Sequence, residues 1–200
     1  MVVLSAREIV GALAPSWSPG ARSLVVGLVV TLDASLMEVV AVGSRYWTWS
    51  EPGYLGIPPI GILGWGFFAA ASSWWLDRRA RFGLLLLPLV AGLATHALLL
   101  AAWWGLLRHV ARGELPPAFQ LAPALLALGV AVFAWRAPGV AARTTLVARV
   151  PAAILFVVLL ASAAYDRDTT SRVVHVALVA IPYVVVSARV FARHRVRAAA

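Results

Sequence analysis

Long apolar runs separated by short polar segments dominate the chain, which contains 200 residues. Each run approaches the roughly 20 residues that a helix needs to cross the hydrocarbon core of a bilayer. The pattern therefore predicts an all-α fold, a polytopic membrane helix bundle of about six transmembrane helices that forms one integral membrane domain over residues 1–200. The predicted spans are Leu24–Val42, Leu55–Leu76, Phe82–Leu107, Ala118–Trp135, Thr144–Tyr165 and Val173–Phe191.

The residues before the first run predict a short interfacial helix. Ser5–Glu8 has the spacing of a capping box, in which the Ser and Glu side chains bond the first free backbone N–H groups. Ile9, Val10 and Leu13 then form a short apolar stripe that stops before Pro15. A secretory leader has a basic segment followed by a longer apolar run, so we do not expect one here.

Composition supports a membrane location. Apolar residues make up 62% of the chain and charged residues 12%, whereas soluble domains are typically about 45–50% apolar and about 25% charged. This excludes a typical soluble enzyme, a disordered chain and a secreted disulfide scaffold. Cysteine is absent, which removes disulfides, thiolate metal sites and iron–sulfur clusters. Lysine is also absent, which removes Schiff-base chemistry.

The net charge of +9 comes from arginines that stand singly or in short groups between the apolar runs. This distribution is typical of topology signals and differs from the continuous basic stripe of a nucleic-acid binder, so no nucleic-acid partner is expected. The strongest basic groups are the turn Asp77–Arg81 and the tail after Phe191. They predict that both termini are cytoplasmic, and the lysine-free, Arg- and Ala-rich composition favours a bacterial inner membrane.

Ionisable residues inside the predicted spans are the first functional candidates, because they are costly to place in hydrocarbon. Asp33 and Glu38 lie on the first span but about 140° apart around a helix, so they are not expected to form one carboxylate pair. An ion pair with Arg149 would be a sufficient structural reason for Asp33. His96 and His175 are expected at different depths, which argues against a bis-histidine haem site.

The segment Tyr46–Gly66 is rich in tryptophan, glycine and proline. An aromatic belt at the outer membrane interface accounts for Trp47 and Trp49. It accounts poorly for Trp65, which lies inside the second predicted span and is surrounded by glycines. Two explanations stay open for these glycines, namely close helix packing and a slot for a flat, elongated apolar ligand.

A short signature follows Glu38. It consists of Gly43, Tyr46-Trp47-Thr48-Trp49, Gly53-Tyr54-Leu55-Gly56-Ile57-Pro58 and Gly64-Trp65. Over about residues 33–68, this order resembles that of membrane-bound carotenoid biosynthesis proteins, the family of the bisanhydrobacterioruberin hydratases and carotenoid 1,2-hydratases. The resemblance implies a carotenoid or other long isoprenoid as the ligand. It also implies a lyase-type reaction that adds water to a terminal double bond of an acyclic carotenoid. The residues expected to bind this substrate are Trp47, Trp49, Tyr54, Pro58, Gly64 and Trp65.

Hydration of such a bond requires an acid that protonates one alkene carbon and a water molecule that captures the resulting cation. Glu38 and Asp33 are the candidate catalytic acids, because apolar surroundings favour the neutral carboxyl form that donates a proton. The faces of Trp47, Trp49 and Trp65 would stabilise the cation without attacking it. The reaction requires no metal or organic cofactor, and none is expected.

The alternative is a non-catalytic protein that binds a carotenoid or membrane lipid, or a structural subunit that docks with membrane protein partners in a larger complex. The predicted spans after the second contain no carboxylate, which favours this alternative. The context of Glu38 favours the enzyme. Glu38→Gln separates the two, because it is expected to abolish hydration but to leave pigment binding largely intact.

Overall fold

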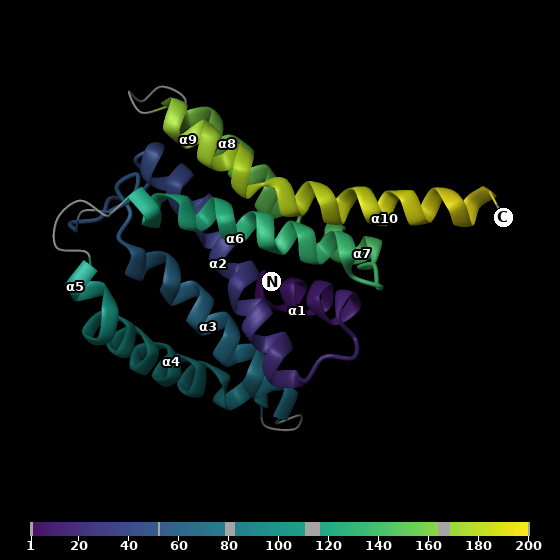
Figure 1. Cartoon of the computed structure of the whole chain (residues 1–200), viewed down its shortest axis with the longest axis horizontal. Coiled ribbons are helices and arrows are strands. Elements are labelled where there is room, and N and C mark those ends of the chain that lie inside the picture. The colour runs from purple at the N-terminus through teal and green to yellow at the C-terminus, as the bar shows by residue number, and fades with distance from the viewer. Residues whose placement is uncertain (1, 52, 79–82, 111–116, 164–168, 200) are drawn as a thin grey trace.

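The structure is a computed structural model that describes residues 2–51, 53–78, 83–110, 117–163 and 169–199 (Figure 1). These residues form helices joined by turns, with one isolated β-bridge between Tyr54 and Ile57. The predicted all-α class is therefore confirmed. The helices are α1 (Val2–Leu13), α2 (Pro19–Gly43), α3 (Pro59–Arg78), α4 (Gly83–Ala102), the π-helical turn η1 (Trp103–Leu107), α5 (Arg108–Val110), α6 (Pro117–Arg136), α7 (Arg143–Val147), α8 (Val150–Ala163), α9 (Thr169–Val179) and α10 (Ile181–Ala199).

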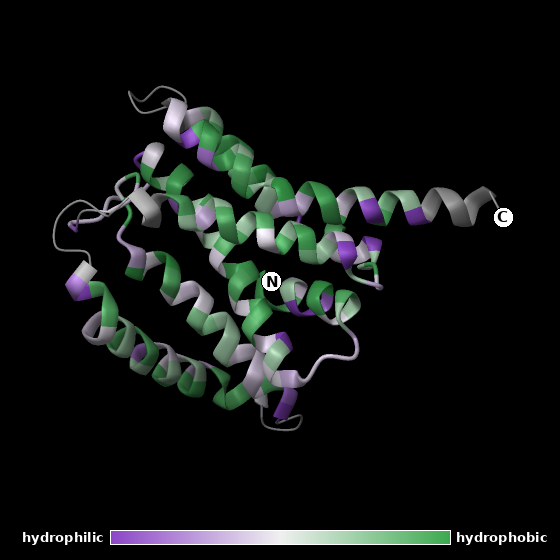
Figure 2. Cartoon of the chain, in the orientation of Figure 1, coloured by the Kyte–Doolittle hydropathy of each residue, from purple (hydrophilic) through white to green (hydrophobic). Residues whose placement is uncertain are grey.

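Four helical stretches are long and apolar enough to cross a membrane, which gives the chain the features of a membrane protein. They are Pro19–Gly43, Gly83–Leu107, Arg143–Ser162 and Thr170–Arg193, found among the described residues. The first stretch is 67% buried within the bundle, but the second is only 6% and the third only 11% buried. Figure 2 shows the hydrophobic colour continuing along α4 and α8. Exposed apolar helices of this kind are covered by lipid in a membrane protein.

These four stretches match the first, third, fifth and sixth predicted spans. The second and fourth predicted spans also form helices, α3 and α6, but neither is among the four, and the apolar part of α6 is the shorter Leu121–Arg136. The predicted start of the second span, Leu55, was wrong. Leu55 has a φ of 53° and belongs to a turn, so the helix begins at Pro59. Phe82 and Tyr165, which bound two predicted spans, and Arg79 and Arg81 of the basic turn lie outside the described residues.

Prolines interrupt the last two apolar stretches. α7 ends at Val147 and α8 begins at Val150, just before Pro151, while α9 and α10 are separated at Ala180, just before Pro182. Proline has no N–H to give to the preceding turn and its ring clashes with that turn's carbonyl group, so helices break or bend there. As a result, Arg149 lies at the first break and Tyr183 immediately after the second.

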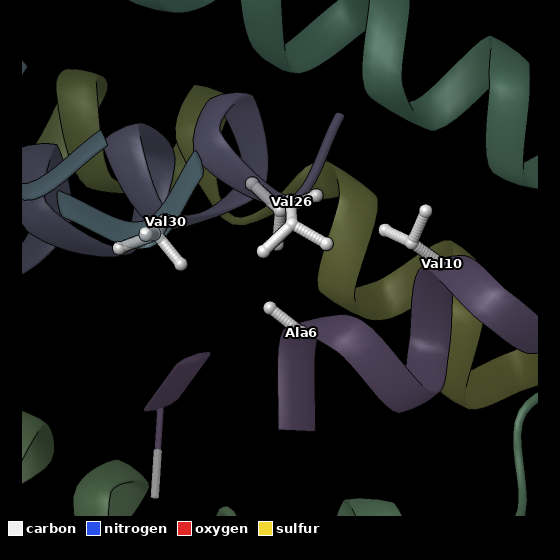
Figure 3. Close-up of a cluster of buried hydrophobic side chains, with 6 residues drawn as sticks. Ala6, Val10, Val26 and Val30 are labelled. Carbon is white, nitrogen blue, oxygen red and sulfur yellow. The ribbon is translucent and has the colours of Figure 1, made fainter. Parts of the chain in front are cut away.

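The N-terminal helix α1 packs into the bundle. Ala6 and Val10 of α1 face Val26 and Val30 of α2 in a buried cluster (Figure 3). The predicted capping box was wrong: α1 already begins at Val2, and the Ser5 hydroxyl donates to the Val2 carbonyl at 2.9 Å instead of capping the helix. The apolar stripe predicted for this segment is therefore present, but Ile9, Val10 and Leu13 are all buried against protein and do not face a membrane surface.

Candidate functional site

Three tryptophans surround the carboxylate of Glu38. Trp47 Nε1–H and Trp49 Nε1–H donate to Glu38 Oε2 at 3.0 and 3.1 Å, and Trp65 Nε1–H donates to Oε1 at 3.3 Å. Glu38 lies on α2 and is 4% exposed. Trp47 and Trp49 belong to the loop between α2 and α3, whereas Trp65 belongs to α3. The structure therefore brings together four of the residues singled out from the sequence. We call them the Glu38–tryptophan cluster.

The loop folds back over Glu38 because of local backbone features. α2 ends at Gly43, and Arg45, with a φ of 58°, reverses the chain so that Tyr46 N–H donates to the Ala41 carbonyl at 2.9 Å. Further along, Gly61 has no side chain, and a Cβ there would lie 2.8 Å from the Trp49 ring. This glycine is therefore what allows the Trp49 ring to lie against α3.

Other glycines of the segment Tyr46–Gly66 have separate packing roles. A Cβ on Gly53 would lie 1.9 Å from the Ile57 carbonyl oxygen, and one on Gly66 would lie 2.0 Å from the Thr31 hydroxyl of α2. Gly64, which was predicted to bind substrate, faces Leu99 of α4, with a Cβ placed 3.6 Å from that side chain. Close packing, one of the two explanations considered above, thus accounts for Gly66 at the contact between α2 and α3.

The electrostatics of the cluster are unusual for a buried carboxylate. Neither ion pair found in the described part of the chain involves Glu38. The three indole N–H groups instead supply the hydrogen bonds that a carboxylate loses when it leaves water. A carboxylate has about four lone-pair positions, and three indoles occupy three of them. One position is then left for a proton or for a polar group of a ligand.

Asp33 lies in a different polar group. The Arg149 guanidinium donates to Asp33 Oδ2 at 2.5 Å and to Oδ1 at 3.3 Å, and the Tyr183 hydroxyl donates to Oδ1 at 2.5 Å. Arg149 Nε also donates to the Ser5 hydroxyl at 3.0 Å. This is the ion pair that the sequence offered as a structural reason for Asp33. Asp33 and Glu38 do not share a site, as their angular separation predicted. We call the group of Ser5, Asp33, Arg149 and Tyr183 the Asp33 network.

A third buried polar contact joins Ser35 of α2 to His175 of α9. The Ser35 hydroxyl and His175 Nε2 are 2.9 Å apart, and both residues are buried. The ring of Tyr54, a predicted substrate-binding residue, lies 5.4 Å from the His175 ring. This contact was missed from the sequence, because a lone serine in an apolar helix carries no signal of its partner. Among the described residues, no three His, Asp or Glu side chains group together to hold a metal ion.

An apolar groove of about 240 Å³ runs between α2, α3 and α6. Ser35 and Tyr54 are among its lining residues, together with Ile57, Ile62 and Leu63. Pro58, also predicted to bind substrate, is buried next to this lining. The remaining predicted residue, Trp65, is 55% exposed although its N–H reaches Glu38, so its ring lies at the outer surface of α3. Comparison of the chain with protein-family models, with curated proteins and with solved structures gives no match.

Proposed function

We propose that this chain is a carotenoid-modifying membrane protein that adds water to a terminal double bond of an acyclic carotenoid. The observation that carries the proposal is the Glu38–tryptophan cluster: a buried carboxylate beneath three indoles, two of which come from one loop. The proposal includes six spans, with α3 and α6 crossing beside the four membrane-length apolar stretches. It places both termini in the cytoplasm and the bundle in a bacterial inner membrane.

The proposed reaction uses Glu38 twice. In its neutral form, the carboxyl group protonates the terminal alkene carbon, and the π bond becomes the new C–H bond together with a tertiary cation. Water then attacks the cation to form the C–O bond, and the proton that it loses returns to the Glu38 carboxylate. Glu38 therefore ends as it began, and the net change is one water added. The indole rings would stabilise the cation electrostatically, without forming a bond to it.

The surroundings of Glu38 suit a long apolar substrate. The exposed ring of Trp65 offers a surface over which a polyene end could approach from the lipid. The groove between α2, α3 and α6 is mostly apolar, and Tyr54 and Ile57 of the loop that contains Trp47 and Trp49 are among its lining residues. In this proposal Asp33 is not the acid, because Arg149 and Tyr183 already bind its carboxylate. Asp33 instead holds α2 to the helices on its other side.

A second function, binding without catalysis, is favoured by one observation. The three indole N–H bonds fill most of the acceptor capacity of Glu38, so the cluster also works as a clamp that fixes the loop. A clamped, tryptophan-rich surface would hold a carotenoid or a lipid without changing it.

The test is product analysis in a host that accumulates an acyclic carotenoid. Expression of the chain is expected to yield pigment heavier by one water. Glu38→Gln, which keeps the shape of the side chain, is expected to abolish this product. Glu51→Gln is the matched control, because Glu51 lies in the same loop but is exposed. Unchanged pigment that co-purifies with the folded protein would replace the enzyme by the binding function. Unchanged pigment with a colourless folded protein would refute both.

A further inference from the structure

The Asp33 network forms part of the wall of two cavities. One, of about 280 Å³, is lined by Asp33, Arg149 and Tyr183 together with apolar side chains that include Met37 and Phe156. The other, of about 220 Å³, also touches Arg149 and Tyr183 and continues between α1, α6 and α10. A polar group set in the wall of an otherwise apolar cavity is the usual design of a site that binds a small molecule by one polar end.

The network is open to the larger cavity. The side chains of Arg149 and Asp33 keep 18% and 17% of their surface exposed. Residues of α1, α2, α8 and α10 line the larger cavity with them. Complete enclosure would strengthen the attraction of an ion pair, but it would also remove the hydration of both charges and close the pair to any ligand. The exposure instead leaves both side chains within reach of a molecule in the cavity.

The network also keeps hydrogen-bonding capacity. A guanidinium carries five N–H groups, and three bonds, one each from Nε, Nη1 and Nη2, go to Ser5 and Asp33. The Asp33 carboxylate has about four lone-pair positions, and Arg149 and Tyr183 use three of them. A donor on Arg149 and an acceptor on Asp33 are therefore both left for a further group.

These features select the chemistry of that group. The ion pair is neutral overall, so it does not favour an anionic or a cationic head. A hydroxyl group matches what is left, since its oxygen can accept from Arg149 while its proton is donated to Asp33. The apolar remainder of the lining matches a hydrocarbon chain. We propose that the larger cavity, of about 280 Å³, binds the hydroxyl end of a neutral lipid alcohol. We call it the Arg149 cavity.

This site is separate from the Glu38–tryptophan cluster. Glu38 does not line the Arg149 cavity, and its three indole partners lie on α3 and the preceding loop, whereas the network reaches toward α1, α8 and α10. The inference therefore does not rest on the proposed hydration. Glu38→Gln is expected to leave binding in the Arg149 cavity unchanged.

The experiment uses the full chain in lipid nanodiscs and a geranylgeraniol probe that carries a photoreactive diazirine on its hydrocarbon chain. After irradiation, mass spectrometry is expected to place the label on side chains of the cavity such as Met37 and Phe156. Unlabelled geranylgeraniol is expected to compete about fivefold better than its methyl ether, because the ether cannot donate to Asp33. Squalene, which has no polar end, is expected to compete least.

A pair of variants on α8 tests the location. Ala152 lines the Arg149 cavity, so Ala152→Phe is expected to reduce labelling at least tenfold without touching the network. Ala161 is an exposed alanine of the same helix that does not line it, so Ala161→Phe is expected to label like the parent. Competition by hexadecanol as strong as that by geranylgeraniol would extend the site to lipid alcohols in general, and weaker competition would restrict it to isoprenoid alcohols. Squalene competing as well as geranylgeraniol, or unchanged labelling of Ala152→Phe, would overturn the proposal.

Discussion

Removal of Arg149 is the perturbation whose cost follows most directly from the structure. Arg149→Met keeps the length of the apolar stem but leaves the Asp33 carboxylate with Tyr183 as its remaining described partner. Breaking a buried pair by removing one member costs about 3–5 kcal/mol, because the other charge stays behind without compensation. The two side chains keep 18% and 17% exposure to the cavity, so we expect the lower end, about 3 kcal/mol.

The assay is the free energy of unfolding in mixed detergent micelles, followed by circular dichroism, for Arg149→Met, Asp33→Asn and the double variant. The double variant removes both charges and leaves an amide that can still accept from Tyr183. Its cost is therefore expected to fall about 2 kcal/mol below the sum of the single costs. Single costs that add to the double cost within about 0.5 kcal/mol would refute the reasoning, because independent sites add in this way.

The remaining predictions concern packing, the cluster and the membrane. Gly66→Ala is expected to destabilise the fold by about 2 kcal/mol, because its Cβ would lie 2.0 Å from the Thr31 hydroxyl. Gly92→Ala is the control and is expected to be neutral or slightly stabilising, because nothing lies within 4 Å of a Cβ there. Thermal unfolding of the two variants makes the comparison. Glu38→Gln is expected to cost about 1–2 kcal/mol and to change the tryptophan emission, because indole N–H groups donate to both Glu38 oxygens and Gln replaces one of these oxygens by an NH₂ donor. Identical stability and emission would contradict this. A spin label at Leu85, which is 80% exposed on α4, is expected to be relaxed by oxygen and not by a water-soluble nickel chelate, and the absence of native cysteine makes this labelling specific.

Much of the fold could be predicted because hydrophobic pattern fixes helices in a chain of this composition. Four predicted spans match helical stretches long and apolar enough to cross a membrane. The errors fall where local backbone chemistry overrides hydrophobicity. The turn at Leu55 is apolar in sequence but left-handed in conformation, and Ser5 is a helix-interior residue although its spacing to Glu8 imitates a cap.

The candidate site could be predicted in part, for reasons of helical geometry. Periodicity was enough to separate Asp33 from Glu38, because the angle between residues on one helix is known from their spacing. The scarcity of charges in the predicted spans suggested Arg149 as the partner of Asp33, because ionisable residues inside a membrane usually pair with one another. The partners of Glu38 were not predictable, since which side chain meets which depends on how α2 and α3 rotate and on the fold of the loop.

Tyr183 and the pair of Ser35 and His175 were missed for the same physical reason. Tyr183 and Ser35 are common residues in apolar helices, and His175, although noted as ionisable, gave no indication of its partner. These contacts depend on the break before α10 and on the packing of α9 against α2. Pro151 and Pro182 lie beside the two breaks, but Pro88 and Pro123 lie inside α4 and α6, so a proline in this sequence does not by itself predict a break.

If Glu38 carries out the proposed hydration, the oxygen atom of the product comes from water, and its origin can be followed with an isotope. The purified chain in nanodiscs is supplied with lycopene in water enriched in oxygen-18, and the extracted pigment is analysed by mass spectrometry. We expect a carotenoid alcohol that carries oxygen-18, formed by the parent chain and by Glu51→Gln but not by Glu38→Gln. A product formed equally by Glu38→Gln, or no labelled alcohol from a folded parent chain that binds the pigment, would contradict it.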